Sequence, residues 1–384
     1  MVRPEAVICA AVRSPVGKRG GGLAGTHPVD LSAHILNALV QRSGIDPAVV
    51  DDVIWGCVSQ VGEQTFNVGR NAVLAAGWPE SVPGTTIDRQ CGSSQQSVHF
   101  AAAAVMSGQC DVVVAGGVEV MSRVPMGSGI GKDAGMPLGP MFMDRYDGVY
   151  PNQGVGAEMI AHRWGLTRTQ LDTYSIGSHA KAGAAQDAGL FEEEIAPIPA
   201  AEMVKADEGI RRGSTVEKLG TLPTPFAEDG VISAGNASQI SDGSAALLVT
   251  TPERAVELGL TPMVRVHTAV LAGDDPVIML TAPIPATAKA LAKAGLRIDD
   301  IGSFEVNEAF APVPLAWLVE TGADPARLNP DGGAIALGHP LGGSGARLMT
   351  TLIHRMRRDN IRYGLQAMCE GGGMANATIL ELVG

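Results

Sequence analysis

The feature that most constrains the fold of this chain is an internal duplication. Residues 38–58, ALVQRSGIDPAVVDDVIWGCV, read as a helix, a glycine stop, an acidic turn and an apolar strand, and residues 290–310 repeat this pattern. A Gly/Ser-rich turn, a helix and a strand ending in paired glycines occupy residues 91–117 and again 342–372. The strands AVICAAVRSPVG and MVRVHTAVLAG, which open the two halves, also correspond. Chance similarity in an Ala/Gly-rich chain would rarely preserve this order, so gene duplication is favoured.

Each half alternates strands with helices, which predicts two similar α/β units that pack helix layer against helix layer. We expect residues 1–117 plus about 240–262 to form the N-terminal core half, and residues 263–384 the C-terminal core half. Residues 118–239 differ in composition from the two halves: Met-, Gly- and Pro-rich segments precede a helix that Thr167 caps, with Gln170 as its capping-box partner. This insert above one face of a sheet is a natural place for ligand contacts.

Charge and cysteine content exclude several classes of protein. The net charge of −12 disfavours nucleic acid and anionic lipid as partners, although a local basic patch can still bind a phosphorylated ligand. We find no signal-peptide pattern, no apolar run approaching the ~20 residues of a membrane span and no peroxisomal signal, so we expect a soluble cytoplasmic protein. The 5 cysteines are widely spaced without a C-x-x-C pair, so we expect neither a disulfide framework nor a metal site.

Cys91 lies between a predicted strand and a predicted helix, in TTIDRQCGSSQQ. A cysteine at a helix N-terminus meets the positive end of the helix dipole, which should lower its pKa and favour the thiolate. Its backbone N–H is then free to bind an oxyanion. The position alone fits equally well a buried cysteine that fills a tight strand–helix corner.

Three further residues occupy similar turns. His339 lies in the glycine-dense GGAIALGHPLGGSGAR, while Asn307 and Cys369 each follow or end an apolar strand. A lone histidine is more often structural than catalytic, but closely spaced glycines let the backbone approach a ligand. Because Cys91 and His339 precede equivalent helices of the two halves, pseudo-twofold packing would bring their turns together in one pocket.

The chain resembles the thiolase superfamily along essentially its whole length. The strings that carry the resemblance are DRQCGSSQQ, AGGVEVMSR, GNASQISDGSAAL, VNEAFA, GGAIALGHPLGGSGAR and MCEGGGMANA. The resemblance implies a layered α-β-α-β-α fold with an inserted loop domain, and a reaction between CoA and a 3-ketoacyl-CoA or its reverse, a Claisen condensation. No permanently bound cofactor is expected; coenzyme A and acyl-CoA are substrates.

The same resemblance implies a role for each residue of the pocket. Cys91 would be the nucleophile that carries the acyl group, and His339 would activate it and help to hold the thioester oxygen. Asn307 would position a water that completes this first oxyanion hole. Cys369 would exchange a proton with the acetyl carbon, and the N–H groups of Cys91 and Gly371 would form a second hole.

The insert would be the loop domain that binds CoA and mediates oligomerisation, and a homo-oligomer, dimer or tetramer, is expected. Arg211 matches the position that meets the nucleotide end of CoA, and Ser238 a contact to the pantetheine arm. The alternatives are that Arg211 and Arg212 form a solvated surface pair and that Ser238 is a turn hydroxyl.

Departures from the family pattern bear on the acyl group. Short-chain thiolases usually carry His-Met where this chain has Asn152 and Gln153; their M-G-x-G-P turn is replaced by a segment that begins at Met279, and their NASG by NASQ with Gln239. The resemblance places all of these residues near the acyl and pantetheine end of the pocket. The combination is more similar to thiolases for bulky or sterol-side-chain acyl groups.

Three alternatives remain to be weighed. A ketoacyl synthase of the same fold lacks the second catalytic cysteine, so Cys369 argues against it. A non-catalytic acyl-CoA or sterol carrier on a thiolase scaffold would have no need of the full set of catalytic residues. A nucleotide-binding dehydrogenase is disfavoured because VVVAGGVEV lacks G-x-G-x-x-G spacing.

Overall fold

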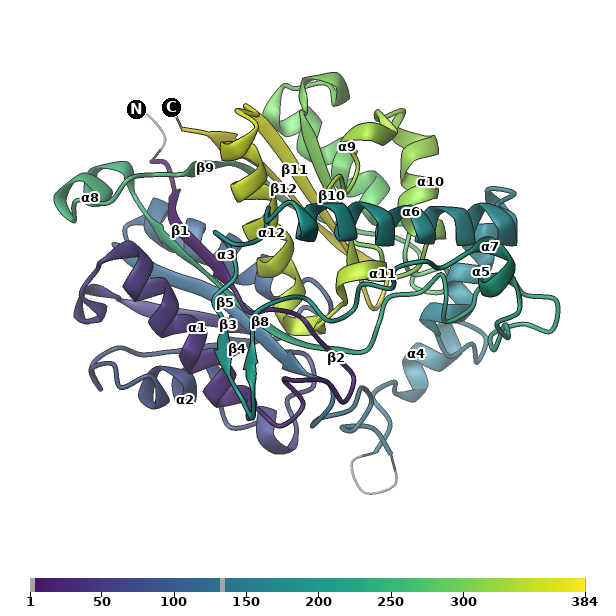
Figure 1. Ribbon diagram of the computed structural model, residues 1–384, viewed down its shortest axis with the longest axis horizontal. Coiled ribbons are helices and arrows are strands. Elements are labelled where there is room, and N and C mark those ends of the chain that lie inside the picture. Colours follow the sequence, from purple (N-terminus) through teal and green to yellow (C-terminus); the bar gives the residue numbers. More distant parts are fainter. Residues whose placement is uncertain (1–3, 132–134, 384) are drawn as a thin grey trace.

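The computed structural model of this protein describes residues 4–131 and 135–383, and a 10-stranded sheet forms its framework (Figure 1). The strand order is β10-β11-β12-β9-β1-β8-β5-β3-β4, with β2 paired to β8. The strands are β1 (Val7–Arg13), β2 (Gly17–Lys18), β3 (Asp52–Gly56), β4 (Thr85–Ile87), β5 (Val112–Val120), β8 (Ser241–Thr250), β9 (Val264–Gly273), β10 (Ser303–Val306), β11 (Tyr363–Glu370) and β12 (Met374–Leu382). β3–β4, β3–β5 and β10–β11 are parallel pairs, and the other pairs along this order are antiparallel.

The predicted duplication is confirmed element by element. The helices of the two halves are α1 (Pro28–Ser43), α2 (Val68–Ala75), α3 (Ser93–Ser107), α8 (Pro252–Glu257), α9 (Pro283–Ala294), α10 (Pro312–Thr321), α11 (Ala334–Leu337) and α12 (Leu341–Arg358). α1 and α9 end alike, at Gly44 and Gly295, whose φ angles of 74° and 68° lie in the left-handed region that favours glycine. A short 3₁₀ turn then leads into β3 or β10. The halves therefore share one chain path.

The layers follow the expected α-β-α-β-α order. α1 and α2 cover the outer face of the N-terminal strands, and α9, backed by α10, covers the outer face of the C-terminal strands. α3 and α12 pack on each other between the two sets of strands, and α12 contacts strands of both halves. The helix that follows His339 is thus shared by both halves, and it lies beside the helix that follows Cys91.

A short seam joins the two sets of strands. β1 and β9 pair antiparallel through Val7 with Arg265 and Ile8 with Val264. The rest of β1 pairs with β8, and most of β9 pairs with β12. This seam makes the strands of both halves one continuous sheet, which the duplicated sequence did not indicate.

The helices of the insert lie toward one end of the molecule, whereas its hairpin packs against the core of the N-terminal half (Figure 1). It contains α4 (Pro140–Arg145), α5 (Gln153–Arg163), α6 (Arg168–Asp187), α7 (Val216–Gly220) and the hairpin β6 (Ile198–Pro199) and β7 (Met203–Val204). The predicted capping box of Thr167 and Gln170 is present at the start of α6. Among the described residues no helix is both long and apolar enough to span a membrane.

Candidate active site

Cys91 lies in the turn between β4 and α3, directly before the N-cap residue Gly92. The preceding residue, Gln90, has a φ of 48°, and its N–H donates to Asp88 Oδ1 at 2.6 Å. Such a left-handed residue is uncommon outside glycine and asparagine, so the turn is held in an unusual shape by its surroundings. This shape places the Cys91 sulfur in a buried pocket at the start of α3, as the sequence predicted.

The electrostatic state of Cys91 differs from our expectation. Burial raises the pKa of its thiol above the ordinary value, and the nearby Cys369 and Glu370 raise it further. Hydrogen bonds to the sulfur from the Cys91 backbone N–H and the Gln153 side chain act in the opposite direction but are weaker. The expected pKa depression by the helix dipole was therefore wrong for the unliganded site, because loss of solvation outweighs it. The resting residue is a thiol.

His339 is held by a buried hydroxyl between α11 and α12. Its Nδ1 lies 2.6 Å from Ser344 Oγ, and that hydroxyl donates its only hydrogen to Pro340 O at 3.0 Å. Ser344 must then accept from Nδ1–H, so Nε2 carries no proton. Burial and the charge of Arg347 lower the pKa of His339 to about 3, which keeps the ring neutral.

Asn307 connects His339 with Cys369. Its Nδ2 lies 3.4 Å from His339 Nε2 and 3.8 Å from Cys369 Sγ, and its Oδ1 has no hydrogen-bond partner among the described residues. Burial raises the pKa of Cys369 to about 12, although the Asn307 hydrogen bond lowers it in part. Since Cys369 also acts on the pKa of Cys91, the structure gathers the four side chains predicted to be catalytic into one buried cluster.

Gly371 follows β11 and packs beside the nucleophile turn. A methyl group added at Gly371 would lie 2.8 Å from Gln90 Oε1. This close approach puts the backbone of Gly371 next to the turn that carries Cys91. Both N–H groups of the predicted second oxyanion hole therefore belong to adjoining segments.

Glu308, the residue after Asn307, ties the insert to the core. Its carboxylate accepts hydrogen bonds from Tyr174 and Ser178 of α6 at 2.8 and 2.7 Å. Asn329 Nδ2 and the Ile335 N–H donate to it as well, at 2.9 and 3.1 Å. This buried hub fixes the loop that carries Asn307 and the approach of α11 to His339.

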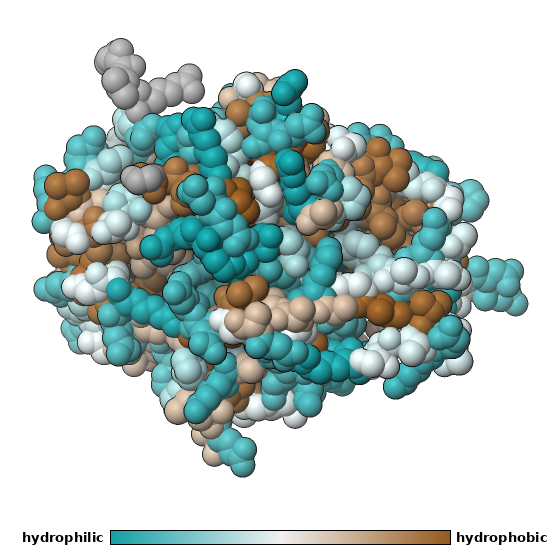
Figure 2. All heavy atoms as spheres, turned by 45° about the horizontal axis from the view of Figure 1, so that its top comes forward, coloured by the Kyte–Doolittle hydropathy of each residue, from teal (hydrophilic) through white to brown (hydrophobic). Residues whose placement is uncertain are grey.

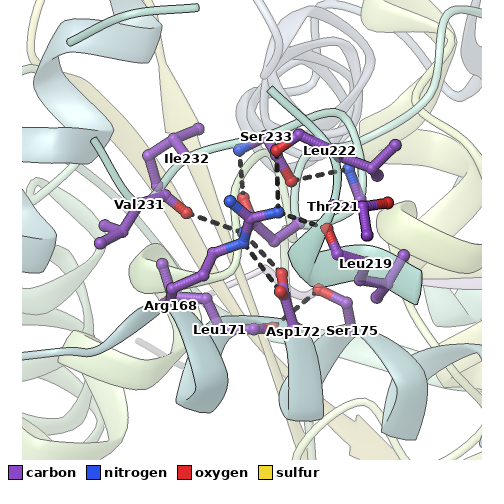
Figure 3. A network of polar contacts seen from close by, with 12 residues as sticks. Arg168, Leu171, Asp172, Ser175, Leu219, Thr221, Leu222, Val231, Ile232 and Ser233 are labelled. Atoms are coloured by element: carbon purple, nitrogen blue, oxygen red, sulfur yellow. Dashed lines mark hydrogen bonds and ion pairs between the residues drawn. The ribbon is translucent and has the colours of Figure 1, made fainter. Parts of the chain in front are cut away.

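A second network holds the segment 231–239, which contains Ser238. Arg168 and Asp172 of α6 form its base, joined at 2.8 Å, and Asn236 Nδ2 donates to Asp172 Oδ1 at 2.9 Å (Figure 3). The Ser238 N–H donates to Ala309 O at 2.9 Å. The segment therefore runs beside the loop that follows Asn307, and Ser238 is partly exposed there.

A cavity of about 250 Å³ opens beside this segment, against α6 and α11. Its lining includes three basic residues, Arg211, Arg212 and Lys218, although the whole chain is acidic. Arg212 is paired with Asp187 at 2.7 Å. In the part of the chain that the structure describes, the exposed Arg211 guanidinium makes no hydrogen bond or ion pair. It is thus available to an anionic ligand, unlike its neighbour.

The Gln239 side chain has a structural role that the sequence did not indicate. Its Nε2 donates to Gly209 O and Ile335 O, both at 2.8 Å, and so ties the loop before Arg211 to α11. It lines the cavity, but its amide nitrogen is already engaged by the protein.

Met279 is buried and has a φ of 64°. It belongs to an apolar cluster with Cys369, Ala309 and Ile335, against which Phe226 packs. Met279 and Cys369 therefore belong to the same apolar core cluster.

Three further side chains contribute to this site, and sequence reasoning placed only Gln153 near the pocket. Ser344 orients His339, Gln153 contacts the Cys91 sulfur, and the Glu370 carboxyl acts on both cysteines. Only Gln153 carried a signal, because it departs from the family pattern. In residues 4–131 and 135–383 no group of His, Cys, Asp and Glu side chains is arranged to hold a metal ion.

Comparison with known proteins places this arrangement in a family. The chain matches the family described as "Thiolase, N-terminal domain" over residues 6–253 and that described as "Thiolase, C-terminal domain" over residues 260–382. It is 51% identical over 387 residues to the steroid 3-ketoacyl-CoA thiolase FadA6 of Mycobacterium tuberculosis, covering 99% of this chain and 95% of that protein. It is 42% identical over 391 residues to the 3-ketoacyl-CoA thiolase FadA of Escherichia coli, covering 99% of this chain and 100% of that protein. The matches span both core halves and the insert, and the chain therefore belongs to the thiolase family.

Proposed function

We propose that this acyltransferase cleaves 3-ketoacyl-CoA with CoA to acetyl-CoA and a shortened acyl-CoA, or performs the reverse Claisen condensation. The observation that carries the proposal is the buried cluster of two thiols, a neutral imidazole and an amide whose oxygen is unpartnered. One thiol can carry an acyl group while the other moves a proton at carbon.

The first half of the proposed reaction uses both cysteines. Cys91 Sγ attacks the 3-keto carbon as its proton passes to the unprotonated Nε2 of His339. The C–C bond breaks, and the electron pair leaves with acetyl-CoA as its enolate, which Cys369 protonates. A thiolate is needed only during attack, which is consistent with the raised pKa of the resting Cys91 thiol.

The second half regenerates the enzyme. The thiol of free CoA gives its proton to the Cys369 thiolate and attacks the acyl carbon on Cys91. The Cys91 sulfur leaves and recovers a proton from His339. Negative charge develops on oxygen in both halves, and we assign its stabilisation to a water on Asn307 Oδ1 together with His339, and to the N–H groups of Cys91 and Gly371.

We assign CoA to the insert, residues 118–239, as the loop domain of the proposed division. The unpaired guanidinium of Arg211 would meet a phosphate at the nucleotide end, and Ser238 the pantetheine arm. Gln239 would shape this channel through its backbone contacts rather than by binding with its amide nitrogen.

For the acyl group we propose a bulky or sterol-side-chain chemistry. The relative named for steroid 3-ketoacyl-CoA is 51% identical over 99% of this chain. Of the departures from the short-chain pattern, Gln153 lies beside the Cys91 thiol and Met279 shares an apolar cluster with Cys369. The carrier alternative is disfavoured because relatives at 42–51% identity are named as thiolases.

The experiment is thiolysis of a series of 3-ketoacyl-CoAs, from acetoacetyl to branched and steroid side-chain esters, followed by loss of enolate absorbance. Cys91→Ala should abolish turnover. Cys9→Ala is the matched control, since Cys9 is also a buried thiol with a raised pKa, about 12, but lies in β1. Undiminished activity in Cys91→Ala would refute the nucleophile, and absence of wild-type activity on every ester would favour the carrier.

We further propose a cytoplasmic homo-oligomer, a dimer or tetramer. Supporting this, apolar side chains are exposed on the insert, including Met126, Met136 and Met141, and Figure 2 shows apolar patches among hydrophilic ones on the face it views. Light scattering of the purified protein measures its mass directly; a monomer at micromolar concentration would contradict the proposal.

A further inference from the structure

Glu370 is a buried acid that the reaction as written does not use. It ends β11 directly after Cys369, and its side chain is fully buried. The Asn376 backbone N–H lies near the carboxyl group and lowers its pKa in part, but neither carboxyl oxygen makes a hydrogen bond of normal geometry in the described part of the chain. A buried carboxylate without partners is costly, so this group needs either a counterion or a proton.

Its surroundings supply an acceptor. A methyl group added at Gly92 would overlap Glu370 Oε1 and lie 2.8 Å from Asn376 Oδ1, so both oxygens face the same space at the start of α3. Asn376 is oriented by its Nδ2, which donates to Gln96 Oε1 at 3.2 Å, and its Oδ1 is unpartnered too. Two facing acceptors repel each other, but a protonated carboxyl would donate to the amide oxygen and satisfy both.

No counterion replaces that proton. Arg89, on the loop before α3, is the nearest cation, yet no ion pair with Glu370 forms among the described residues, and Asp88 on the same loop opposes it. The remaining titratable groups facing this space are the thiols of Cys91 and Cys369 and, behind Asn376, His99, whose pKa burial lowers to about 3. Burial accordingly raises the pKa of Glu370 to about 8.

We propose that Glu370 is a positioning residue for the cysteine pair: it is held uncharged by donating to Asn376 Oδ1, and loss of its proton turns off thiolate formation at Cys91 and Cys369. The inference rests on the proposed roles of these cysteines. While Glu370 is neutral, the pocket can develop negative charge on sulfur or on the enolate. Once it ionises, a fixed negative charge next to both sulfurs opposes each of those steps.

This arrangement has an unusual kinetic consequence. A cysteine nucleophile ordinarily becomes more reactive as pH rises, because more of it is thiolate. Here ionisation of Glu370 raises the pKa of Cys91 in the same range, so reactivity should level off above about pH 8. Each unit by which the pKa of Cys91 rises reduces the thiolate fraction about tenfold.

The test is alkylation of Cys91 by iodoacetamide between pH 6 and 10, quantified by mass spectrometry of its peptide, in the wild type, Glu370→Gln and Glu370→Ala. The ratio of variant to wild-type rate should be constant below pH 7 and should grow about tenfold or more above pH 8. Glu305→Gln is the matched control, because Glu305 is also fully buried, unpartnered and raised in pKa to about 8, but lies on β10. Melting temperatures of all variants verify folding.

Parallel alkaline limbs in wild type and both Glu370 variants would overturn the inference, as would an equal change in Glu305→Gln. Thiolysis measured over the same pH range separates this failure from that of the proposed function. An active wild type with an unchanged limb in Glu370→Gln refutes only the role of Glu370. A wild type without thiolysis refutes the proposed function, while the alkylation data still report on Glu370.

Discussion

Replacing Ser344 with alanine tests how His339 is prepared for proton transfer. The mutation removes the acceptor 2.6 Å from Nδ1 in a fully buried setting. The ring can keep Nδ1–H unsatisfied, or move the proton to Nε2, where it can no longer accept one from Cys91. A buried unsatisfied donor costs about 1–3 kcal/mol. If this cost raises the free energy of the transition state, kcat/KM falls roughly 5- to 150-fold.

The assay is thiolysis of a good 3-ketoacyl-CoA with kcat and KM measured separately, and KM should change little because Ser344 touches no proposed substrate position. Ser97→Ala is the control: Ser97 is equally buried in the equivalent helix α3 and makes the same backbone bond, to Ser93 O at 3.1 Å, but holds no histidine. If Ser344→Ala retains activity within twofold of Ser97→Ala, the reasoning about the tautomer is refuted.

Other perturbations follow from the same geometry. Met279→Ala should leave a cavity in the apolar cluster that contains Cys369, lower stability by about 2–5 kcal/mol, and raise kcat/KM for bulky relative to short esters. The volume-conserving Met279→Leu should change neither stability nor this preference as strongly. An unchanged chain-length profile in Met279→Ala would disprove the proposed position of Met279 beside the acyl group. Arg211→Glu should raise KM for CoA and leave kcat unchanged. Arg212→Glu should raise KM less, because the Arg212 side chain is already paired with Asp187. An equal increase in KM for both variants would contradict the assignment of Arg211 to CoA binding. Because the folded-state pKa of Glu370 is raised from 4.5 to about 8, the stability that this group contributes is lost as pH rises between those values. The stability of Glu370→Gln relative to wild type should therefore increase across that window, by at most a few kcal/mol, and then level off. A difference in melting temperature that does not vary with pH would contradict this.

Much of the fold could be predicted because local sequence patterns specify it and these patterns occur twice. The glycine stops at Gly44 and Gly295, the capping box at Thr167 and the apolar strands each specify their own conformation. Their repetition then indicated that Cys91 and His339 belong to equivalent turns. The seam between β1 and β9 could not be predicted this way, because it depends on how two complete units meet.

The properties of individual side chains were harder to predict. The sequence placed Cys91 at a helix start and therefore suggested a thiolate, but burial in the folded core raises its pKa, and Cys369 and Glu370, on a strand of the other half, raise it further. Gln239 was assigned to the ligand, yet its amide nitrogen bridges two backbone segments far apart in the chain. Both errors have one origin: the local sequence does not reveal which distant atoms complete a side chain's environment.

The seam and the shared central helices also bear on how the molecule matures. The proposed nucleophile Cys91 belongs to one half and the proposed proton acceptor His339 to the other, so the proposed site contains residues of both halves. These residues meet only where α12 packs against α3 and strands of both halves. If the proposed roles hold, assembly of the core and completion of the site are therefore a single event.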